Sequence, residues 1–422
     1  MPKRGAEEAP DWWFDWSLMP NLKAVVVYQA MKDAVDASRK RAPKKHDHLW
    51  KTYVALFANV ARHYLARTSA KGIAVPRGKR FLARVTRYEP QVFPSSFPII
   101  LDRMEHLGFL KQTKGTYSGL RQRSRRTVIS AGPALIKMID EAGLKLTDIS
   151  SPRPVELIVL NSAPKDHWDE PVRVDYKDTP TTRKYRKELQ EINEWLVGAD
   201  IAFSPPEGFE TPVDVSQRRM TRRFSQGSFQ CGGRLYGAFW ETLRKDARRT
   251  GLRIEGERIA EVDYKAINPM LAYHHVRAVP PEGDPYELPG FPKDRETRAA
   301  IKELMNAQFF RPLSNRYPKE FDRPAFKKKW KFSQVVEAIL ARHPLLRGVL
   351  SSGVIGHTLQ FWESQLLIRV LKRCKQVNIV ALPLHDSVIV RASASREVRE
   401  IMETEFEKFA GFPIGVTIEG HR

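Results

Sequence analysis

The stretch QVNIVALPLHDSVIVRAS, residues 376–393, carries the strongest fold signal in the chain. Two apolar runs, Val377 to Leu382 and Val388 to Arg391, flank His385-Asp386-Ser387, so the pattern predicts a β-hairpin with an acid at its bend. A carboxylate beside so much apolar sequence is costly unless a cation or solvent meets it. Asp386 is therefore a candidate functional residue.

A second acid follows a predicted strand in ERIAEVDYKAINPMLAYHH, residues 257–275. The run Ile259 to Val262 predicts a strand that ends at Asp263, and a helix is predicted from Ala266. Such an acid alone is often only a helix cap. With Asp386 on an adjacent strand end, however, Asp263 could hold two divalent ions, an arrangement that activates a 3′-hydroxyl and stabilises a leaving pyrophosphate.

A third segment, RETRAAIKELMNAQFF (residues 295–310), predicts a helix with one polar face. Arg298, Lys302, Asn306 and Phe310 follow one another at intervals of four residues, so they line that face. Two cations, an amide and a ring in this order suit a triphosphate at one end and a base or sugar at the other. The alternative is an exposed helix with an ordinary basic side.

The order D-Y-x-x-I, R-x-x-x-K-x-x-x-N-x-x-x-F and H-D-S resembles motifs A, B and C of family A DNA polymerases and single-subunit RNA polymerases. The resemblance covers about residues 215–422 and continues into the final helix and strand, REVREIMETEFEKFAGF and PIGVTIEG. It implies a right-hand polymerase of the mixed α/β (α+β) class, with an antiparallel palm sheet and helical fingers at about residues 285–350. The stretch RRFSQGSFQCGGRLYGAFWE also resembles proteins of phages and other mobile elements, which suggests a reduced form.

This resemblance implies a role for each matched residue. Asp263 and Asp386 would be the catalytic carboxylates and would bind two Mg²⁺ ions, with Mn²⁺ as a substitute. The residues implied in nucleotide binding are Arg298, Lys302, Asn306, Phe310, Asn268 and Tyr264. Those implied in primer or template binding are His385, Gln360 and Arg234, with Arg222 and Arg223 as weaker candidates that could equally be surface charge.

Three departures from the family pattern concern the choice of sugar. Asn268 stands where family A DNA polymerases usually carry a glutamate that blocks a ribose 2′-hydroxyl. H-D-S is the form of single-subunit RNA polymerases, but Phe310 stands where those enzymes keep a tyrosine. We favour a DNA-directed DNA polymerase that uses dNTPs, with an RNA polymerase or primase that uses NTPs as the alternative. No proofreading exonuclease is expected, because the N-terminal 150 residues lack its carboxylate cluster.

The N-terminal region, residues 1–150, is predicted to be a helical DNA-binding domain. Predicted helices at 21–39, 49–67 and 99–107 precede GFLKQTKGTYSGLRQRSRRTVIS, which reads as a strand, a turn and a very basic strand. This order resembles a winged-helix domain, in which wing cations contact phosphates. Those cations would be Arg121, Arg123, Arg125 and Arg126, although the hairpin could also be merely solvated. Residues 151–225 would form a connecting region and reduced thumb, and 226–422 the palm and fingers.

The composition agrees with a nucleic-acid partner. The chain has 422 residues and a formal net charge of +22, and 42% of its residues are hydrophobic, which favours packed domains that bind a polyanion. Its two cysteines, Cys231 and Cys374, exclude a disulfide framework and favour the cytoplasm. No apolar stretch is long enough to suggest a membrane span. The expected partners are a DNA template and primer, dNTPs and accessory replication proteins.

Two other classes compete with a polymerase. One is a non-catalytic winged-helix replication initiator with a palm-like body. It is disfavoured because both carboxylates and Lys302 are present. The other is a nuclease that uses the same paired acids, but a nuclease has no need for the polar face of Arg298, Lys302 and Phe310.

Overall fold

The computed structural model divides the chain into two compact units. Unit 1 comprises Met1–Glu156 and Glu207–Gln217, and unit 2 comprises Leu157–Pro206 and Arg218–Arg422. The first boundary lies close to the predicted one, but most of the predicted connecting region belongs to unit 2. The residues described are 12–38, 46–66, 71–78, 82, 86–88, 93–115, 117–118, 123–124, 127–150, 156–164, 171–209, 213–311, 316–352 and 354–420.

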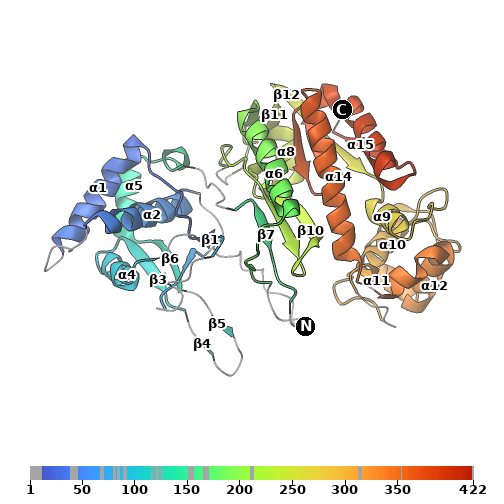
Figure 1. The fold of residues 1–422 in the computed structure, drawn as a ribbon, viewed down its shortest axis with the longest axis horizontal. Helices are drawn as coiled ribbons and strands as arrows, with labels where there is room; N and C mark the ends of the chain where they lie inside the picture. Colours follow the sequence, from blue (N-terminus) through green and yellow to red (C-terminus); the bar gives the residue numbers. More distant parts are fainter. Residues whose placement is uncertain are drawn as a thin grey trace. The chain divides into compact units, whose positions relative to one another are not determined.

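Unit 1 combines helices with a four-stranded sheet (Figure 1). Its helices are α1 (Leu22–Ala37), α2 (His46–Leu65), α4 (Phe97–His106) and α5 (Pro133–Glu141), with a 3₁₀ turn at Leu146–Asp148. Its strands are β1 (Trp12–Trp13), β2 (Ile73–Val75), β3 (Leu110–Thr113), β4 (Tyr117–Ser118), β5 (Arg123–Ser124) and β6 (Thr127–Ala131). The sheet order is β1-β2-β6-β3, and β4 and β5 form a separate antiparallel pair.

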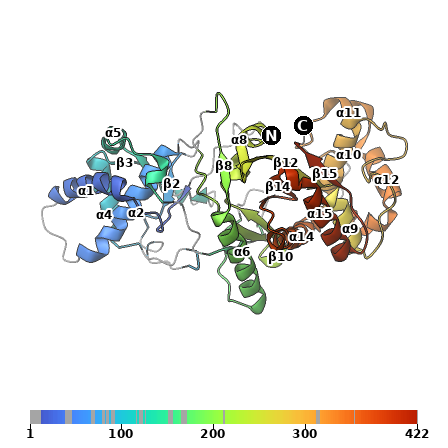
Figure 2. The same cartoon turned by 90° about the horizontal axis from the view of Figure 1, so that it is seen from above.

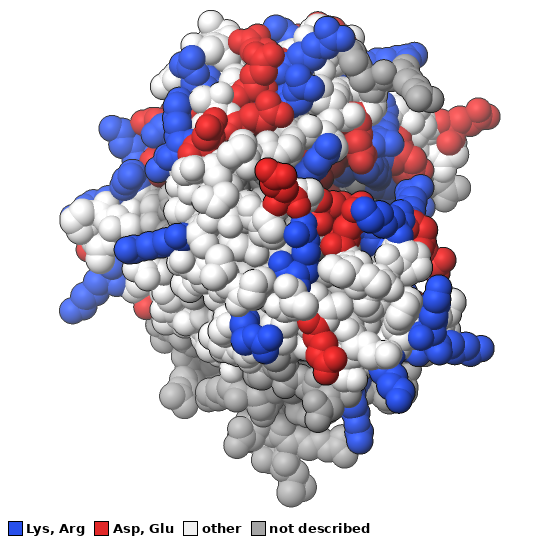
Figure 3. Space-filling view, turned by 90° about the vertical axis from the view of Figure 1, so that its right-hand side faces the viewer, with Lys and Arg blue, Asp and Glu red and all other residues white. Residues whose placement is uncertain are grey.

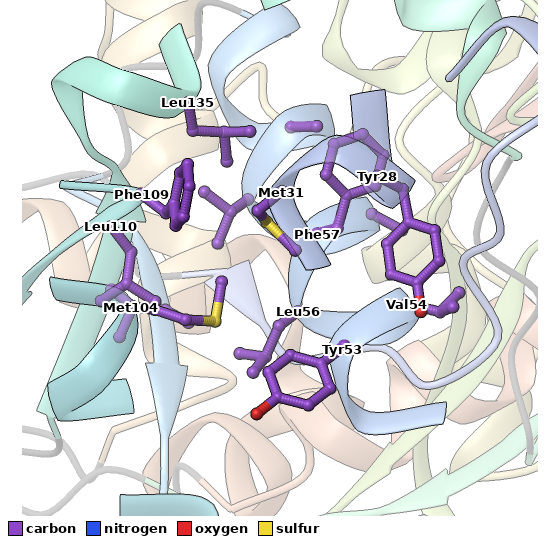
Figure 4. Close-up of a cluster of buried hydrophobic side chains, with 14 of the residues drawn as sticks. Tyr28, Met31, Tyr53, Val54, Leu56, Phe57, Met104, Phe109, Leu110 and Leu135 are labelled. Atoms are coloured by element: carbon purple, nitrogen blue, oxygen red, sulfur yellow. The ribbon is translucent and has the colours of Figure 1, made fainter. Parts of the chain in front are cut away.

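The apolar periodicity of the N-terminal region produces one core in unit 1. Leu56 and Phe57 of α2 are fully buried and lie among side chains from α1, α4, β3 and α5, including Met31 and Leu135 (Figure 4). Asn21 caps α1, because its side chain accepts a hydrogen bond from the backbone amide of Ala24 at 3.0 Å. The predicted helices are therefore present, with shifts of a few residues at their ends.

The segment 207–217 returns from unit 2 to pack on unit 1. Its Asp214 forms an ion pair with Arg62 of α2, and both side chains are almost fully buried. Arg62 also donates to the backbone oxygens of Ile149 and Ser150, so this cation has partners in two parts of unit 1. An unpaired charge at this depth would be costly, which explains why the returning segment carries the acid.

Unit 2 contains two sheets and most of the helices. Its strands are β7 (Ile158–Leu160), β8 (Ile201–Phe203), β9 (Thr221–Ser225), β10 (Ser228–Tyr236), β11 (Leu252–Ile254), β12 (Glu257–Tyr264), β13 (Ala381–Leu384), β14 (Ser387–Arg391) and β15 (Val416–Glu419). Its helices are α6 (Pro180–Gly198), α7 (Phe239–Thr242), α8 (Lys245–Gly251), α9 (Ile267–His275), α10 (Arg295–Gln308), α11 (Pro324–Lys329), α12 (Phe332–Arg342), α13 (Arg347–Ser352), α14 (Gly356–Gln376) and α15 (Ser395–Ala410), with 3₁₀ turns at Pro344–Leu346 and Ala392–Ala394.

The larger sheet of unit 2 is antiparallel and has β12 near its centre. The strand order is β13-β14-β12-β11-β8, and β15 pairs with the second half of β12. The smaller sheet has the order β10-β9-β7, in which β9 and β10 form a hairpin. Helix α14 packs along β10 and against α15 (Figures 1 and 2). The predicted mixed α/β class with antiparallel sheets is confirmed.

The first strand of the 376–393 hairpin is shorter than the apolar run predicts. Helix α14 continues to Gln376, and Asn378 then adopts a left-handed conformation with φ 56°. Asparagine tolerates this conformation better than most residues, so the chain can turn there, and β13 begins only at Ala381. In the described part of the chain, no helix is both long enough and apolar enough to cross a membrane.

Candidate active site

The two predicted acids lie at the same end of the larger sheet. Asp263 of β12 is opposite Ser387 of β14 and, on its other side, opposite Thr417 of β15. Asp386 immediately precedes Ser387, in the two-residue turn that joins the paired residues Leu384 and Ser387. The structure therefore brings together the two carboxylates that lie 123 residues apart in the sequence (386 − 263).

Asp263 is a partly buried carboxylate without a full set of partners. Its Oδ1 atom has no hydrogen-bond partner among the described residues. Burial, together with the charges of Asp386 and Glu261, raises the pKa of Asp263 to about 7, although Lys302 acts in the opposite direction. A nearby cation would relieve both the repulsion and the missing interaction.

The donor set suits a hard divalent cation. Mg²⁺ prefers oxygen ligands, and it is usually held by one or two carboxylates together with water and phosphate oxygens. Asp263 and Asp386 supply carboxylates of this kind, and the buried Oδ1 of Asp263 has no hydrogen-bond partner among the described residues. Within the described residues, no group of three or more His, Cys, Asp and Glu side chains is arranged to hold a metal.

The turn beside Asp386 is held in an unusual conformation. His385 has φ 57°, in the left-handed region, which costs a residue with a Cβ atom about 1 kcal/mol or more. Its exposed imidazole lies edge-on to the ring of Tyr236, with centroids 6.3 Å apart. Partial burial and the Arg234 charge lower the pKa of His385, so its imidazole is neutral at neutral pH.

Helix α10 begins after Asp294, whose carboxylate accepts a hydrogen bond from the backbone amide of Thr297 at 2.8 Å. Arg298 forms an ion pair with Asp284, and its guanidinium lies 5.2 Å from the ring centre of Tyr286. Lys302, one turn further along, is exposed and makes no ion pair with any described residue. The two predicted phosphate-binding cations thus differ. Arg298 already has a carboxylate partner and an aromatic contact, whereas Lys302 forms no ion pair with a described residue.

Asn306 links α10 to two residues outside it. The side-chain amide of Asn268 donates to Asn306 Oδ1 at 3.4 Å, a long hydrogen bond. Asn306 also hydrogen-bonds with the side chain of Tyr286, which is 1% exposed and whose pKa is raised by burial. Tyr286 was not predicted, because it lies in the irregular segment GDPYELPG, which has no helical or strand periodicity.

Phe310 lies just beyond the end of α10 and packs on the start of α14. Its ring is 39% exposed and meets His357 edge-on, with centroids 5.4 Å apart. A Cβ atom on Gly356 would come within 2.4 Å of the Phe310 ring, so only glycine fits there without movement. The backbone amide of Gly356 also donates to the carbonyl oxygen of Phe309 at 2.7 Å. The end of α10 is therefore anchored to α14.

Tyr264 does not belong to the site, contrary to the prediction. Successive residues of a strand point to opposite faces, so Tyr264 faces away from Asp263. Its side chain is 5% exposed, and its hydroxyl donates to the carbonyl oxygen of Met402 in α15 at 2.9 Å. Tyr264 packs α15 against the sheet.

Arg222 is also unavailable for the predicted contact with nucleic acid. Its side chain is fully buried and donates to Gly233 O and to Ser364 Oγ, both at 3.0 Å. The guanidinium lies 4.5 Å from the ring centre of Tyr185. Arg222 therefore joins the smaller sheet to α14. Arg223, the next residue, is exposed and lies over Tyr236.

Arg234 is partly exposed and forms a bidentate ion pair with Glu363 of α14. The two hydrogen bonds measure 2.7 and 2.8 Å, and Glu363 is almost fully buried. Glu363 was not predicted, although it lies three residues after Gln360 on the same helix, a spacing that places both on neighbouring parts of one face. Gln360 hydrogen-bonds with His357, at the end of α14 nearest Phe310.

Most of the predicted wing lies outside the described residues. Arg121, Arg125 and Arg126 lie outside the described residues, and Arg123 is described only as the first residue of β5. In unit 2, the face that carries α11 and α12 shows Lys and Arg side chains interspersed with Asp and Glu (Figure 3). The excess charge is therefore not gathered into one uniform surface on this face.

Comparison with known proteins gives similarity to solved structures but no matching family. No family model and no curated protein matches the chain. Among solved structures, the chain is similar to the POL domain of Pol1 from M. smegmatis, in complex with DNA primer-template and dNTP, with a TM-score of 0.34 and 10% sequence identity. The similarity covers 95% of this chain and 66% of that chain, so this chain spans just under two thirds of that domain's length.

Proposed function

We propose that the chain catalyses template-directed nucleotidyl transfer and acts as a DNA-directed DNA polymerase. The observation that carries the proposal is the pair of Asp263 on β12 and Asp386 in the turn just before the adjacent strand β14, with one oxygen of Asp263 unpartnered and Lys302 near enough to affect the pKa of Asp263. A structural ion pair would have neutralised these acids within the protein. The motif order in the sequence supports the same reaction.

Asp263 and Asp386 would hold the divalent cations. Mg²⁺ bound there would stabilise negative charge on the attacking 3′-oxygen and on the leaving pyrophosphate. Lys302, exposed and without an ion-pair partner among described residues, would bind the triphosphate. Arg298 would support it from a fixed position, since Asp284 and the Tyr286 ring hold its guanidinium.

Primer extension with Mg²⁺ tests this proposal. The full chain would be given a primed DNA template with dNTPs, the same template with NTPs, and the unprimed template with each set. We expect primer-dependent incorporation of dNTPs that disappears when Mg²⁺ is chelated. Incorporation of NTPs without a primer would instead indicate a primase or RNA polymerase. No metal-dependent incorporation under any condition would overturn the proposal.

We also propose that unit 1 binds DNA as a winged-helix domain. Helix α4 is followed directly by the antiparallel strands β3 and β6, and the β4–β5 pair extends the hairpin between them. In a winged helix, the helix before such a hairpin enters the major groove and the hairpin contacts the backbone. Replacing all four predicted wing arginines with alanine should weaken duplex binding and reduce its salt dependence, as measured by fluorescence anisotropy.

A further inference from the structure

A pocket of about 530 Å³ lies between α6, β10 and the first half of α14, all in unit 2. Its lining is aromatic, with hydroxyl and amide groups between the rings. The lining residues are Thr179, Thr181, Tyr185, Phe229, Gln230, Thr358, Phe361 and Trp362. No charged side chain is among these described residues. A volume of this size, lined by aromatic side chains with a few polar groups between them, is typical of a site for a small ring compound or base.

Two of the aromatic rings, Phe229 and Tyr185, also pack against other rings of unit 2. Phe229 packs edge-on to Tyr176 with centroids 4.8 Å apart, and Tyr185 stacks on Phe224 at 5.4 Å. The Tyr185 hydroxyl also accepts a hydrogen bond from Gln365 at 3.0 Å. Tyr185 is itself buried, so the partly exposed rings of Phe229, Phe361 and Trp362 are the ones on which a bound ring could stack. Little conformational freedom would be lost on stacking against packed rings, which favours binding.

Trp362 forms another part of the lining and is fixed in a similar way. Its ring packs against His274 and His275 of α9, with centroids 5.2 and 5.3 Å apart. The side chains of Thr181, Gln230 and Thr358 make no hydrogen bond with described residues. These donors and acceptors remain available to the edge of a bound ring.

We infer that this pocket binds an unpaired base of the single-stranded template. Aromatic stacking supplies affinity for any base, and the charge of the chain, +22, supplies attraction for the phosphates. Exposed Lys184 lies three residues after Thr181 on the same helix, so it is a neighbour of Thr181 on the helix surface and suits a phosphate beside such a base. The inference rests on the proposed polymerase function, which provides the single strand.

The position of the pocket fits this role. Gln230 lies four residues before Arg234 on β10, in a part of the strand where the pairing with β9 is irregular. On α14, Phe361 and Trp362 immediately precede Glu363, the partner of Arg234. Tyr236, two residues after Arg234 on the same strand, meets the His385 ring edge-on with centroids 6.3 Å apart. A strand that passes the Asp386 turn would thus need only a few nucleotides to reach the pocket.

Binding of single-stranded DNA without divalent cation tests the inference separately from catalysis. The full chain in EDTA would bind a fluorescein-labelled template with a single-stranded overhang, and abasic sites would be placed at successive overhang positions. Because stacking on one aromatic side chain contributes about 1–3 kcal/mol per base, Trp362→Ala should weaken binding about 10-fold. One abasic position should weaken binding to the native chain and have no further effect on Trp362→Ala.

Three further variants control for folding and specificity. Trp362→Phe keeps a ring and should bind nearly as well as the native chain, whereas Thr358→Phe should fill the pocket and weaken binding. Trp195→Ala removes a tryptophan of α6 that does not line the pocket and should have no effect. Unchanged binding by both Trp362→Ala and Thr358→Phe would overturn the inference. The inference would also be overturned if Trp362→Ala lost the same binding affinity for blunt duplex DNA as for DNA with a single-stranded overhang.

The two proposals fail in different ways. If the polymerase proposal is wrong, the native chain will incorporate no nucleotide even when the template is shown to be bound. If the pocket inference is wrong, the native chain can still extend primers, but the abasic scan will show no position that depends on Trp362.

Discussion

Charged side chains are shielded from water at two places in unit 2, and the protein treats them differently. Between β10 and α14, Arg234 meets Glu363 through two hydrogen bonds of 2.7 and 2.8 Å, and the buried Arg222 donates to Ser364 and Gly233. At the end of β12, Asp263 lies beside a second acid and has one oxygen without a partner.

The difference separates charges that maintain the fold from charges kept for a ligand. Buried charges are tolerated when they are paired and hydrogen-bonded, and the Arg234–Glu363 pair meets that condition. The pair of acids raises the free energy of the folded protein and is useful only when something positive binds. Each prediction below changes one side of this comparison.

The largest effect is expected at the acids. Asp386→Asn should lower the rate of nucleotide incorporation about 10³-fold or more, because it removes charge and a hard oxygen ligand worth several kcal/mol of transition-state stabilisation. The same variant should be at least as stable as the native chain, since it removes the repulsion from Asp263. Single-turnover extension and thermal unfolding would measure the two effects.

A matched control is Asp200→Asn, which changes an exposed acid immediately before β8 of the same sheet. This variant should leave both incorporation and stability close to native. Full activity in Asp386→Asn would show that the carboxylate pair is not the reaction centre.

The next largest effect is expected at the paired charges. Glu363→Ala leaves the Arg234 guanidinium without its partner in a largely buried position and should lower the free energy of unfolding by about 3–5 kcal/mol. Urea unfolding monitored by tryptophan fluorescence measures this change in the free energy of unfolding. Glu320→Ala breaks the exposed pair with Arg311 and should cost less than about 1 kcal/mol. Equal losses in the two variants would contradict the comparison.

A smaller effect is expected on α10, where Arg298 has an ion-pair partner and Lys302 has none among the described residues. Lys302→Ala should raise the KM for the nucleotide about 10- to 100-fold, since a charged hydrogen bond contributes about 1.5–3 kcal/mol. Steady-state kinetics with a primed template would measure the change. Arg298→Ala should affect KM less and stability more, because Arg298 is held by Asp284 and Tyr286. If Arg298→Ala raised the KM for the nucleotide more than Lys302→Ala did, Arg298 would be the main phosphate ligand.

The sequence predicted those features that depend on local pattern. Short apolar runs located β12 and β14, and the i, i+4 spacing located the polar face of α10. The sequence also predicted that Asp263 and Asp386 lie close together, and they do so because β12 pairs with β14 of the hairpin. Local pattern could not reveal partners distant in the chain. Glu363 and Tyr286 acquire their roles only when α14 and the loop before α10 pack beside the sheet.

The incorrect predictions have the same origin. Arg222 was predicted as a weaker candidate for contact with nucleic acid, because a sequence does not show that this arginine will be covered by a helix that follows more than a hundred residues later. Arg234 stays a predicted contact for template or phosphate. In the structure α14 buries one completely and supplies a carboxylate to the other. Tyr264 was assigned to the site with its neighbour Asp263, although strand alternation places the two side chains on opposite faces.

The smallest effect is expected from Tyr264→Phe, which tests that alternation. The substitution removes only the hydroxyl that donates to Met402 O, so stability should fall by about 1 kcal/mol, and the incorporation rate and KM should stay at native values. Asp263, one residue earlier, should show the opposite pattern, with activity lost and stability kept in Asp263→Asn. If Tyr264→Phe instead changed the KM for nucleotide without changing stability, the hydroxyl would have to reach the ligand, and the two faces of β12 would not be separate in function.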